Sequence, residues 1–145
     1  MREILFRGFH KCDGGKEKIF LNGEWICGEW IEGDLSHNQR GQSFIGLNLT
    51  FIWDVIPETI GQYTGLSDKN GKKIFEGDVL KRTLKPTMRI SSIFKIVYVQ
   101  LKSCFSAIDI DGRSVTFISD YINCNYEIEV IGNIFENPEL LGNPQ

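Results

Sequence analysis

The stretch TIGQYTGLSDKNGKKIFEGDVL, residues 59–80, decides the fold of this chain. Four of its glycines stand at turn-compatible places, and the segment from Asp68 to Gly71 is a compact turn signal. Glycine is the default residue where the backbone needs a positive φ, and Asn-Gly is the strongest two-residue hairpin signal. Glu76-Gly77-Asp78 then leads into a new apolar run. The stretch therefore predicts a tight connector that feeds a small β-barrel, with no visible catalytic group.

Short strand-like segments follow this connector. They begin at residues 79–80 and continue at 92–101, 104–110, 114–118 and 128–135. Asp111-Gly112 is a hairpin signal between the third and fourth of them, and residues 81–89 are expected to form a basic loop containing Pro86. Residues 119–122 could add one helical turn capped by Ser119. Short strands without any long segment of helical period predict an SH3-like small β-barrel over residues 59–145.

The upstream residues, 1–58, are interpreted as an N-terminal β-hairpin and strand region. Residues 2–9 form a credible first strand, and residues 19–21 and 24–27 form a hairpin around Asn22-Gly23. The polar residues 32–42 are expected to be an exposed loop. Residues 44–56 alternate apolar and other side chains at every second position, so a single strand that ends at Pro57 is predicted. The expected fold class is therefore all-β throughout.

The charge of the chain is unevenly distributed. The 145 residues carry a net charge of −3, which argues weakly against a general polyanion binder. Residues 61–100 hold eight Lys and Arg against three Asp and Glu, whereas residues 101–145 hold two against seven. These segments either face each other within one domain or leave a basic face for an anionic partner. Both explanations remain open at this point.

The cysteine pattern and the N-terminus indicate a cytoplasmic protein. The four cysteines are widely spaced and include no C-x-x-C pair, so free thiols in a reducing compartment are expected. The first residues lack the long apolar core of a signal peptide. No run approaches the ~20 apolar residues that cross a bilayer, so no membrane association is expected.

Three blocks of the sequence resemble a known family. The first combines REILFRG at residues 2–8 with GEWICG at 23–28; the second is IPETIGQYTGLSDKNGKKIFEGDV at 56–79; the third is EVIGNIFENPELL at 129–141. Together they identify the chain as similar to the YopX-like family of phage and prophage proteins. The resemblance implies an all-β protein with an SH3-like barrel in its C-terminal part, made inside a bacterial host cell. It brings no assigned catalytic residues and no established biochemical role.

Candidate sites for metals or catalysis are weak. His10 and Cys12, with Cys27 or His37, would supply only one closely spaced pair of zinc ligands, so ordinary turn and core roles are favoured. Asp109 and Asp111 lack the other ligands of a calcium loop, and a hairpin turn is the better interpretation. Glu127 and Glu129 lie on one face of a strand and are expected to be solvated. We therefore expect no metal, no cofactor and no enzyme activity.

The basic residues and the tryptophans are the remaining functional clues. The candidate binding residues are Lys72, Lys73, Lys81, Arg82, Lys85, Arg89, Trp25 and Trp30. The cations could contact phosphates, but a solvated loop that balances the acidic C-terminal segment is favoured. The tryptophans could line a protein-binding groove or pack within a sheet. The leading hypothesis is a non-enzymatic module that binds another protein or a second copy of itself, and the alternative is a nucleic-acid-binding module that uses the basic loop 81–89.

Overall fold

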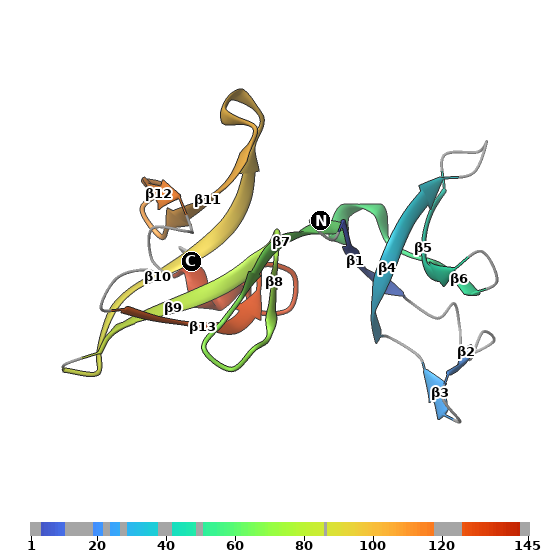
Figure 1. Cartoon of the computed structure of the whole chain (residues 1–145), viewed down its shortest axis with the longest axis horizontal. Coiled ribbons are helices and arrows are strands. Elements are labelled where there is room, and N and C mark those ends of the chain that lie inside the picture. Colours follow the sequence, from blue (N-terminus) through green and yellow to red (C-terminus); the bar gives the residue numbers. More distant parts are fainter. Residues whose placement is uncertain are drawn as a thin grey trace. The chain divides into compact units, whose positions relative to one another are not determined.

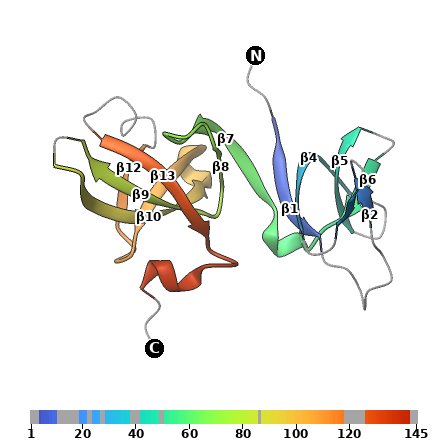
Figure 2. The ribbon, with the colours of Figure 1, turned by 90° about the horizontal axis from the view of Figure 1, so that it is seen from below.

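The computed structural model describes residues 4–10, 19–21, 24–26, 29–37, 42–48, 51–85, 87–117 and 126–142. Its strands pair antiparallel in every ladder, so the all-β prediction is confirmed (Figures 1 and 2). The chain divides into two compact units, Met1–Gln62 and Tyr63–Gln145. The helical segments of the described residues are the 3₁₀ turns η1 (Pro57–Thr59), η2 (Gln100–Lys102) and η3 (Pro138–Leu141). None of these turns is long enough to cross a membrane.

The first unit contains a sheet and a separate hairpin. Its strands are β1 (Phe6–His10), β2 (Ile19–Leu21), β3 (Glu24–Ile26), β4 (Glu29–His37), β5 (Ser43–Asn48) and β6 (Phe51–Asp54). The order in the sheet is β6-β5-β4-β1, and the first two residues of β7 (Gly61–Ser67) pair with the other edge of β1. Strands β2 and β3 form the hairpin that Asn22-Gly23 predicts.

Strand β4 corrects the prediction of an exposed loop over residues 32–42. Ile31 and Gly33 are buried and Leu35 is half-buried, whereas Glu32 and Asp34 between them are exposed. This is the period-two pattern of a strand, obscured by a Glu-Gly-Asp composition that resembles a turn. A side chain at Gly33 would place its Cβ 2.2 Å from the carbonyl oxygen of Gly46, so only glycine permits the close approach of β4 and β5.

Residues 44–56 form two strands instead of the single strand predicted. Strands β5 and β6 pair with each other, with Ile45 opposite Trp53 and Gly46 opposite Ile52. From Phe44 to Gly46 the register pairs residues of equal parity, and it then shifts so that Asn48 stands opposite Phe51. Residues that pair across a hairpin share a face of the sheet, so over the first three pairs both strands follow the same period-two alternation. Period-two alternation alone therefore could not distinguish one long strand from this hairpin.

The core of the first unit is a small apolar cluster. Ile31, Ile45 and Val55 are buried at its centre. Gly8 of β1 packs directly on this centre, since an added Cβ would lie 3.0 Å from Ile45 and from Val55. Thr59 fixes β1 to η1, because its hydroxyl accepts the Phe9 N–H at 2.9 Å.

The second unit contains an open five-stranded sheet, whose edge strands are β12 (Ser114–Phe117) and β13 (Tyr126–Asn133). Besides β7 and its partner β8 (Lys73–Phe75), its other strands are β9 (Asp78–Leu84), β10 (Arg89–Val99) and β11 (Cys104–Asp109). The order is β12-β11-β10-β9-β13. The described residues show no closed barrel, so closure into an SH3-like barrel stays a prediction. The helical turn predicted at residues 119–122 lies outside the described residues.

The core of the second unit fills one face of this sheet. Its buried members are Ile74, Leu80, Phe94, Ile96, Ala107 and Ile128. Fully burying one large apolar side chain contributes about 1.5–3 kcal/mol, so this cluster is a major source of the unit's stability. The buried carboxylate of Asp78 completes the entry into β9 by accepting the Phe75 N–H at 2.8 Å.

The predicted basic loop at residues 81–89 is shorter than expected. Strand β9 continues to Leu84 and β10 begins at Arg89, so most of the predicted loop belongs to these two strands. Lys81 and Arg82 lie within β9, where Lys81 stands opposite Glu129 of β13. Because opposite charges across a strand pair are favourable, the Lys-Arg composition does not prevent pairing here.

Candidate binding site

A turn after β7 is fixed to β13 by one carboxylate. Asp68 Oδ1 accepts the backbone N–H groups of Asn70 and Lys72, both at 2.9 Å, which is the geometry of an Asx turn. Its other oxygen, Oδ2, accepts the N–H of Val130 at 3.0 Å, 62 residues along the chain. The N–H of Lys69 adds a bond to the carbonyl oxygen of Ile128 at 2.9 Å. The turn is therefore anchored on the outer edge of β13.

The environment of Asp68 keeps its carboxylate ionised. Burial on its own would raise the pKa of Asp68, whose residue is 8% exposed. The three backbone donors and the nearby ammonium group of Lys72 outweigh burial and hold the pKa below its ordinary value of 3.8. All of these partners stabilise the fold, so Asp68 is a structural carboxylate.

The hairpin between β11 and β12 repeats the local part of this turn. Asp109 Oδ1 accepts the N–H groups of Asp111 at 3.0 Å and Arg113 at 2.8 Å. Gly112 has φ +77°, as Gly71 has +81° in the first turn. The hairpin interpretation of Asp109 and Asp111 is confirmed. Unlike the Asp68 carboxylate, the Asp109 carboxylate accepts no bond from a distant strand within the part of the chain that the structure describes.

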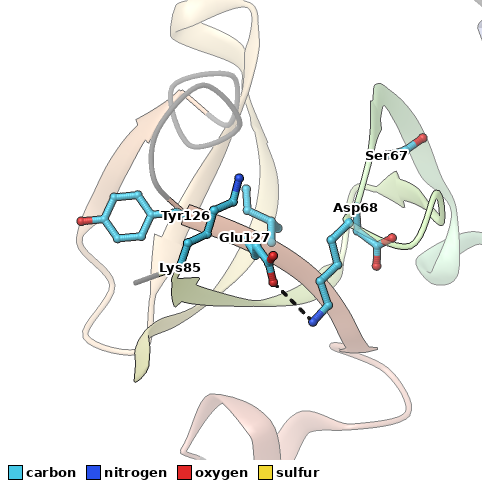
Figure 3. Close-up of a pocket in the computed structure, with 7 residues that line it drawn as sticks. Ser67, Asp68, Lys85, Tyr126 and Glu127 are labelled. Carbon is cyan, nitrogen blue, oxygen red and sulfur yellow. Dashed lines mark ion pairs between the residues drawn. The ribbon is translucent and has the colours of Figure 1, made fainter. Parts of the chain in front are cut away.

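A pocket of about 210 Å³ opens where this turn, the end of β9 and the start of β13 meet. Its lining residues are Ser67, Asp68, Lys69, Lys85, Tyr126, Glu127 and Ile128. In the view of Figure 3, Lys85 and Glu127 lie between the ring of Tyr126 and the Asp68 turn. The pocket is smaller than the roughly 300–1,000 Å³ of sites for drug-sized ligands, so it suits a single side chain or a small group.

Two lysines and two glutamates form an ion-pair network beside the pocket. Lys81 Nζ lies 2.8 Å from Glu129 Oε2, and Lys69 Nζ lies 3.4 Å from the same oxygen. Lys69 also lies 3.8 Å from Glu127, the pair marked in Figure 3. The hydrogen bond from Lys81 and then the one from Lys69 lower the pKa of Glu129, against the raising effect of burial. The two glutamates thus face lysines and do not form an acid–base pair.

The structure does not bring the predicted basic residues together as one exposed loop. Lys81 is paired with Glu129, and the guanidinium of Arg82 stacks 4.6 Å from the centre of the Tyr126 ring. Lys73 lies 5.6 Å above the ring of Tyr63. The exposed members of the set are Lys72, Lys85 and Arg89.

The two tryptophans that the sequence suggests as binding residues lie in different sheets of the first unit. Trp25 is in β3, opposite Phe20 of the β2–β3 hairpin. Trp30 is in β4, where the Phe9 ring meets it edge-on at 5.4 Å and the Arg7 guanidinium lies 4.7 Å from its ring centre. Trp30 therefore has a packing role within the sheet.

Of the four residues considered for zinc, the structure describes His10 and His37. His10 is buried at the end of β1 opposite Glu29, and His37 is exposed at the other end of β4. Cys12 and Cys27 lie outside the described residues. No group of three or more metal-ligating side chains occurs among the residues that the structure describes.

Sequence reasoning missed the exposed tip of the β10–β11 hairpin. Leu101 is 100% exposed and Tyr98 is 42% exposed, whereas the sequence predicts only that both belong to a strand over residues 92–101. The polar residues that flank Leu101, Gln100 and Lys102, are the signal that could have located the turn.

Comparisons with known proteins place the chain in one family. The family model of the YopX protein matches residues 6–142. A search of curated proteins gave no match. Among solved structures, the crystal structure of protein EF1440 from Enterococcus faecalis is similar at 26% identity, over 97% of this chain and 99% of that one, with a TM-score of 0.48. The match over most of its length means that this chain belongs to the YopX protein family.

Proposed function

We propose that this chain is a non-enzymatic module that binds another protein through the tip of the β10–β11 hairpin. The observation that carries the proposal is the apolar surface there, made by the fully exposed Leu101 and the half-exposed ring of Tyr98. Exposed apolar groups that gather at one place are typical of contact surfaces, and tyrosine is enriched among the residues that dominate binding energy.

The hairpin tip extends beyond the rest of the sheet. The last β10 residue that pairs with β9 is Lys95, opposite Val79, whereas pairing with β11 continues to Val99, opposite Cys104. The end of the hairpin is therefore a two-stranded ribbon, visible beyond β9 in Figure 1. A ribbon of this kind can enter a concave partner surface that a flat sheet could not reach.

The tip is ordered before any partner arrives. The ring of Tyr98 meets that of Phe105 edge-on, with centroids 5.2 Å apart. Ser103 adopts a left-handed conformation with φ 49°, and its N–H donates to Gln100 O at 3.1 Å. Side chains that are already held in place lose less conformational entropy on binding, which favours affinity.

Protein is favoured over nucleic acid as the partner. Lys102 is the charged residue of the η2 turn, so the tip lacks the cluster of cations that neutralises phosphates. Of the basic set, Lys81 and Arg82 are already engaged with Glu129 and Tyr126. The alternative keeps the exposed Lys72, Lys85 and Arg89 as phosphate contacts. DNA or RNA affinity that falls steeply with salt, and falls again in Lys85→Gln, would favour this alternative.

The same proposal includes the cellular setting and the absence of catalysis. The family resemblance favours a phage or prophage accessory protein in the cytoplasm of a bacterial host. The pKa values of Asp68 and Glu129 are both displaced downwards. A general acid at neutral pH needs the opposite displacement, so neither of these two carboxyl groups suits that role.

The test compares the wild-type chain with a tip variant and a matched surface control. Tyr98→Ser with Leu101→Asp removes the apolar tip, while Ile110→Ser removes an exposed apolar residue at the other end of β11. We expect a host protein, or a second copy seen by light scattering, to be bound by wild type and by Ile110→Ser and lost in the tip variant. Equal binding by wild type and the tip variant would refute the proposal.

A further inference from the structure

The outer edge of β13 is partly covered by the Asp68 turn. Strand β13 ends the order of the five-stranded sheet, with β9 as its neighbour. The groups bonded by the turn are Ile128 O and Val130 N–H, which must point away from β9. In an antiparallel ladder, every second residue directs both backbone groups to the same side, so Tyr126 also faces outward. The turn therefore occupies one part of the edge and ends before Tyr126.

The pocket lies at this boundary of the covered edge. Tyr126, Glu127 and Ile128 supply one of its walls, and the turn residues Ser67, Asp68 and Lys69 supply another. An extended peptide that continued along β13 past the turn would thus pass the pocket opening. Main-chain bonds to a strand edge give affinity, and adjacent pockets for alternate side chains give specificity.

The pocket lining holds two carboxylates and two lysines, and of the lysines Lys85 is the one available to an acidic group. Asp68 is saturated by backbone donors, and Glu127 faces Lys69 at 3.8 Å. Lys85 is exposed at the pocket and makes no ion pair with any residue that the structure describes. A carboxylate that entered the pocket would pair with Lys85, which is otherwise left to solvent. The volume of about 210 Å³ accepts one such side chain.

We propose that the β13 edge at Tyr126, together with the Ile128 N–H, binds an extended peptide whose acidic side chain enters this pocket and pairs with Lys85. The peptide adds as a short strand, and the Asp68 turn sets where pairing begins. This site is separate from the hairpin tip, so the proposal stands or falls independently of the function proposed above.

The test uses blocked synthetic peptides with the sequence Thr-Val-Glu-Val-Thr and, as the neutral match, Thr-Val-Gln-Val-Thr. Binding to the isotopically labelled full chain is followed by NMR. We expect the Glu peptide to shift the amide signals of Tyr126 and Ile128 and to bind at least about tenfold more tightly than the Gln peptide. Lys85→Gln should remove this preference, and Lys72→Gln, at an exposed lysine outside the pocket lining, should retain it.

A further peptide separates strand addition from simple ion capture. N-methylation of the two valines keeps the carboxylate but removes backbone donors, so it should weaken binding about tenfold or more. Three results would overturn the proposal: no shift at millimolar Glu peptide, equal affinity of the Glu and Gln peptides, or an N-methylated peptide that binds as well as its parent. Loss of host-protein binding in the tip variant, with peptide binding intact, would confirm that the two sites are distinct.

Discussion

The bond between Asp68 and Val130 should make Asp68 far more important to stability than a local turn residue. Asp68→Ala removes an acceptor that serves three backbone donors. The donors on Asn70 and Lys72 belong to exposed residues, where water can replace the carboxylate, so each bond contributes about 0.5–1.5 kcal/mol. The Val130 N–H lies in a half-buried strand, and leaving it unsatisfied costs about 1–3 kcal/mol.

Asp109→Ala is the matched control for this change. Asp109 holds the same two local donors, at the same sequence spacing, in the β11–β12 turn. Both residues lie in the second unit, so one unfolding transition reports on both. Urea denaturation at pH 7, followed by far-UV circular dichroism, should show that Asp68→Ala destabilises by about 1–3 kcal/mol more than Asp109→Ala. A difference below about 0.5 kcal/mol would refute the argument that the Val130 contact anchors the turn.

The pH dependence of this difference has a definite sign. Because the folded-state pKa of Asp68 is lowered, its charge stabilises the fold fully at pH values above the unfolded value near 3.8. The contribution is lost as the pH falls through the lower folded-state value. The stability gap between wild type and Asp68→Asn should therefore be constant from pH 7 to about pH 5 and shrink below about pH 4. A gap that is unchanged in acid would show that ionisation of Asp68 does not contribute.

Three glycine substitutions test the backbone of the two units. Gly77→Ala should destabilise by about 1–2 kcal/mol, because Gly77 has φ +87° and the new Cβ would lie 3.3 Å from the Phe135 ring. Gly71→Ala has a similar φ of +81° with open space around it, so urea denaturation should show a smaller loss there, and equal losses would exclude the contact with Phe135 as a cause. Gly33→Ala should separate β4 from β5 and cost about 3 kcal/mol or more, since the new Cβ meets Gly46 O at 2.2 Å. Tryptophan fluorescence in urea reports this loss, because all three tryptophans lie in the first unit; an unchanged midpoint would contradict the close approach.

Local signals in the sequence predicted the turns better than the strands. Asn70-Gly71 and Asp111-Gly112 each mark a hairpin turn that the structure contains, because the chemistry that forms such a turn lies within five residues. Strand β4 was missed because its glycine and acidic residues are also typical of loops. The hydrogen bond between Asp68 and Val130 joins residues 62 positions apart. A local sequence pattern cannot predict a bond from a side chain to such a distant backbone group.

In the blocks that resemble the family, several polar side chains have structural roles. In the central block, the carboxylates of Asp68 and Asp78 accept backbone N–H groups, and in the C-terminal block Asn133 Oδ1 accepts those of Phe135 and Glu136 at 3.0 and 2.9 Å. Polar side chains that bond to the backbone around them stabilise the local turn, so these residues have structural roles.

Binding at the surface would then depend on residues outside these structural turns. The exposed Leu101 lies outside all three blocks, and so does Lys85 at the pocket. Neither side chain forms part of the two apolar cores, so each can be replaced without removing packing that the fold needs. Under the two proposals, the turn-forming residues of the blocks would fix the strand order, and the hairpin tip and the pocket would determine what the protein binds. A chimera that keeps the three blocks but exchanges residues 98–105 with those of a relative would test this division: it should fold and lose the original partner. A chimera that folds and keeps that partner would assign recognition to the blocks themselves.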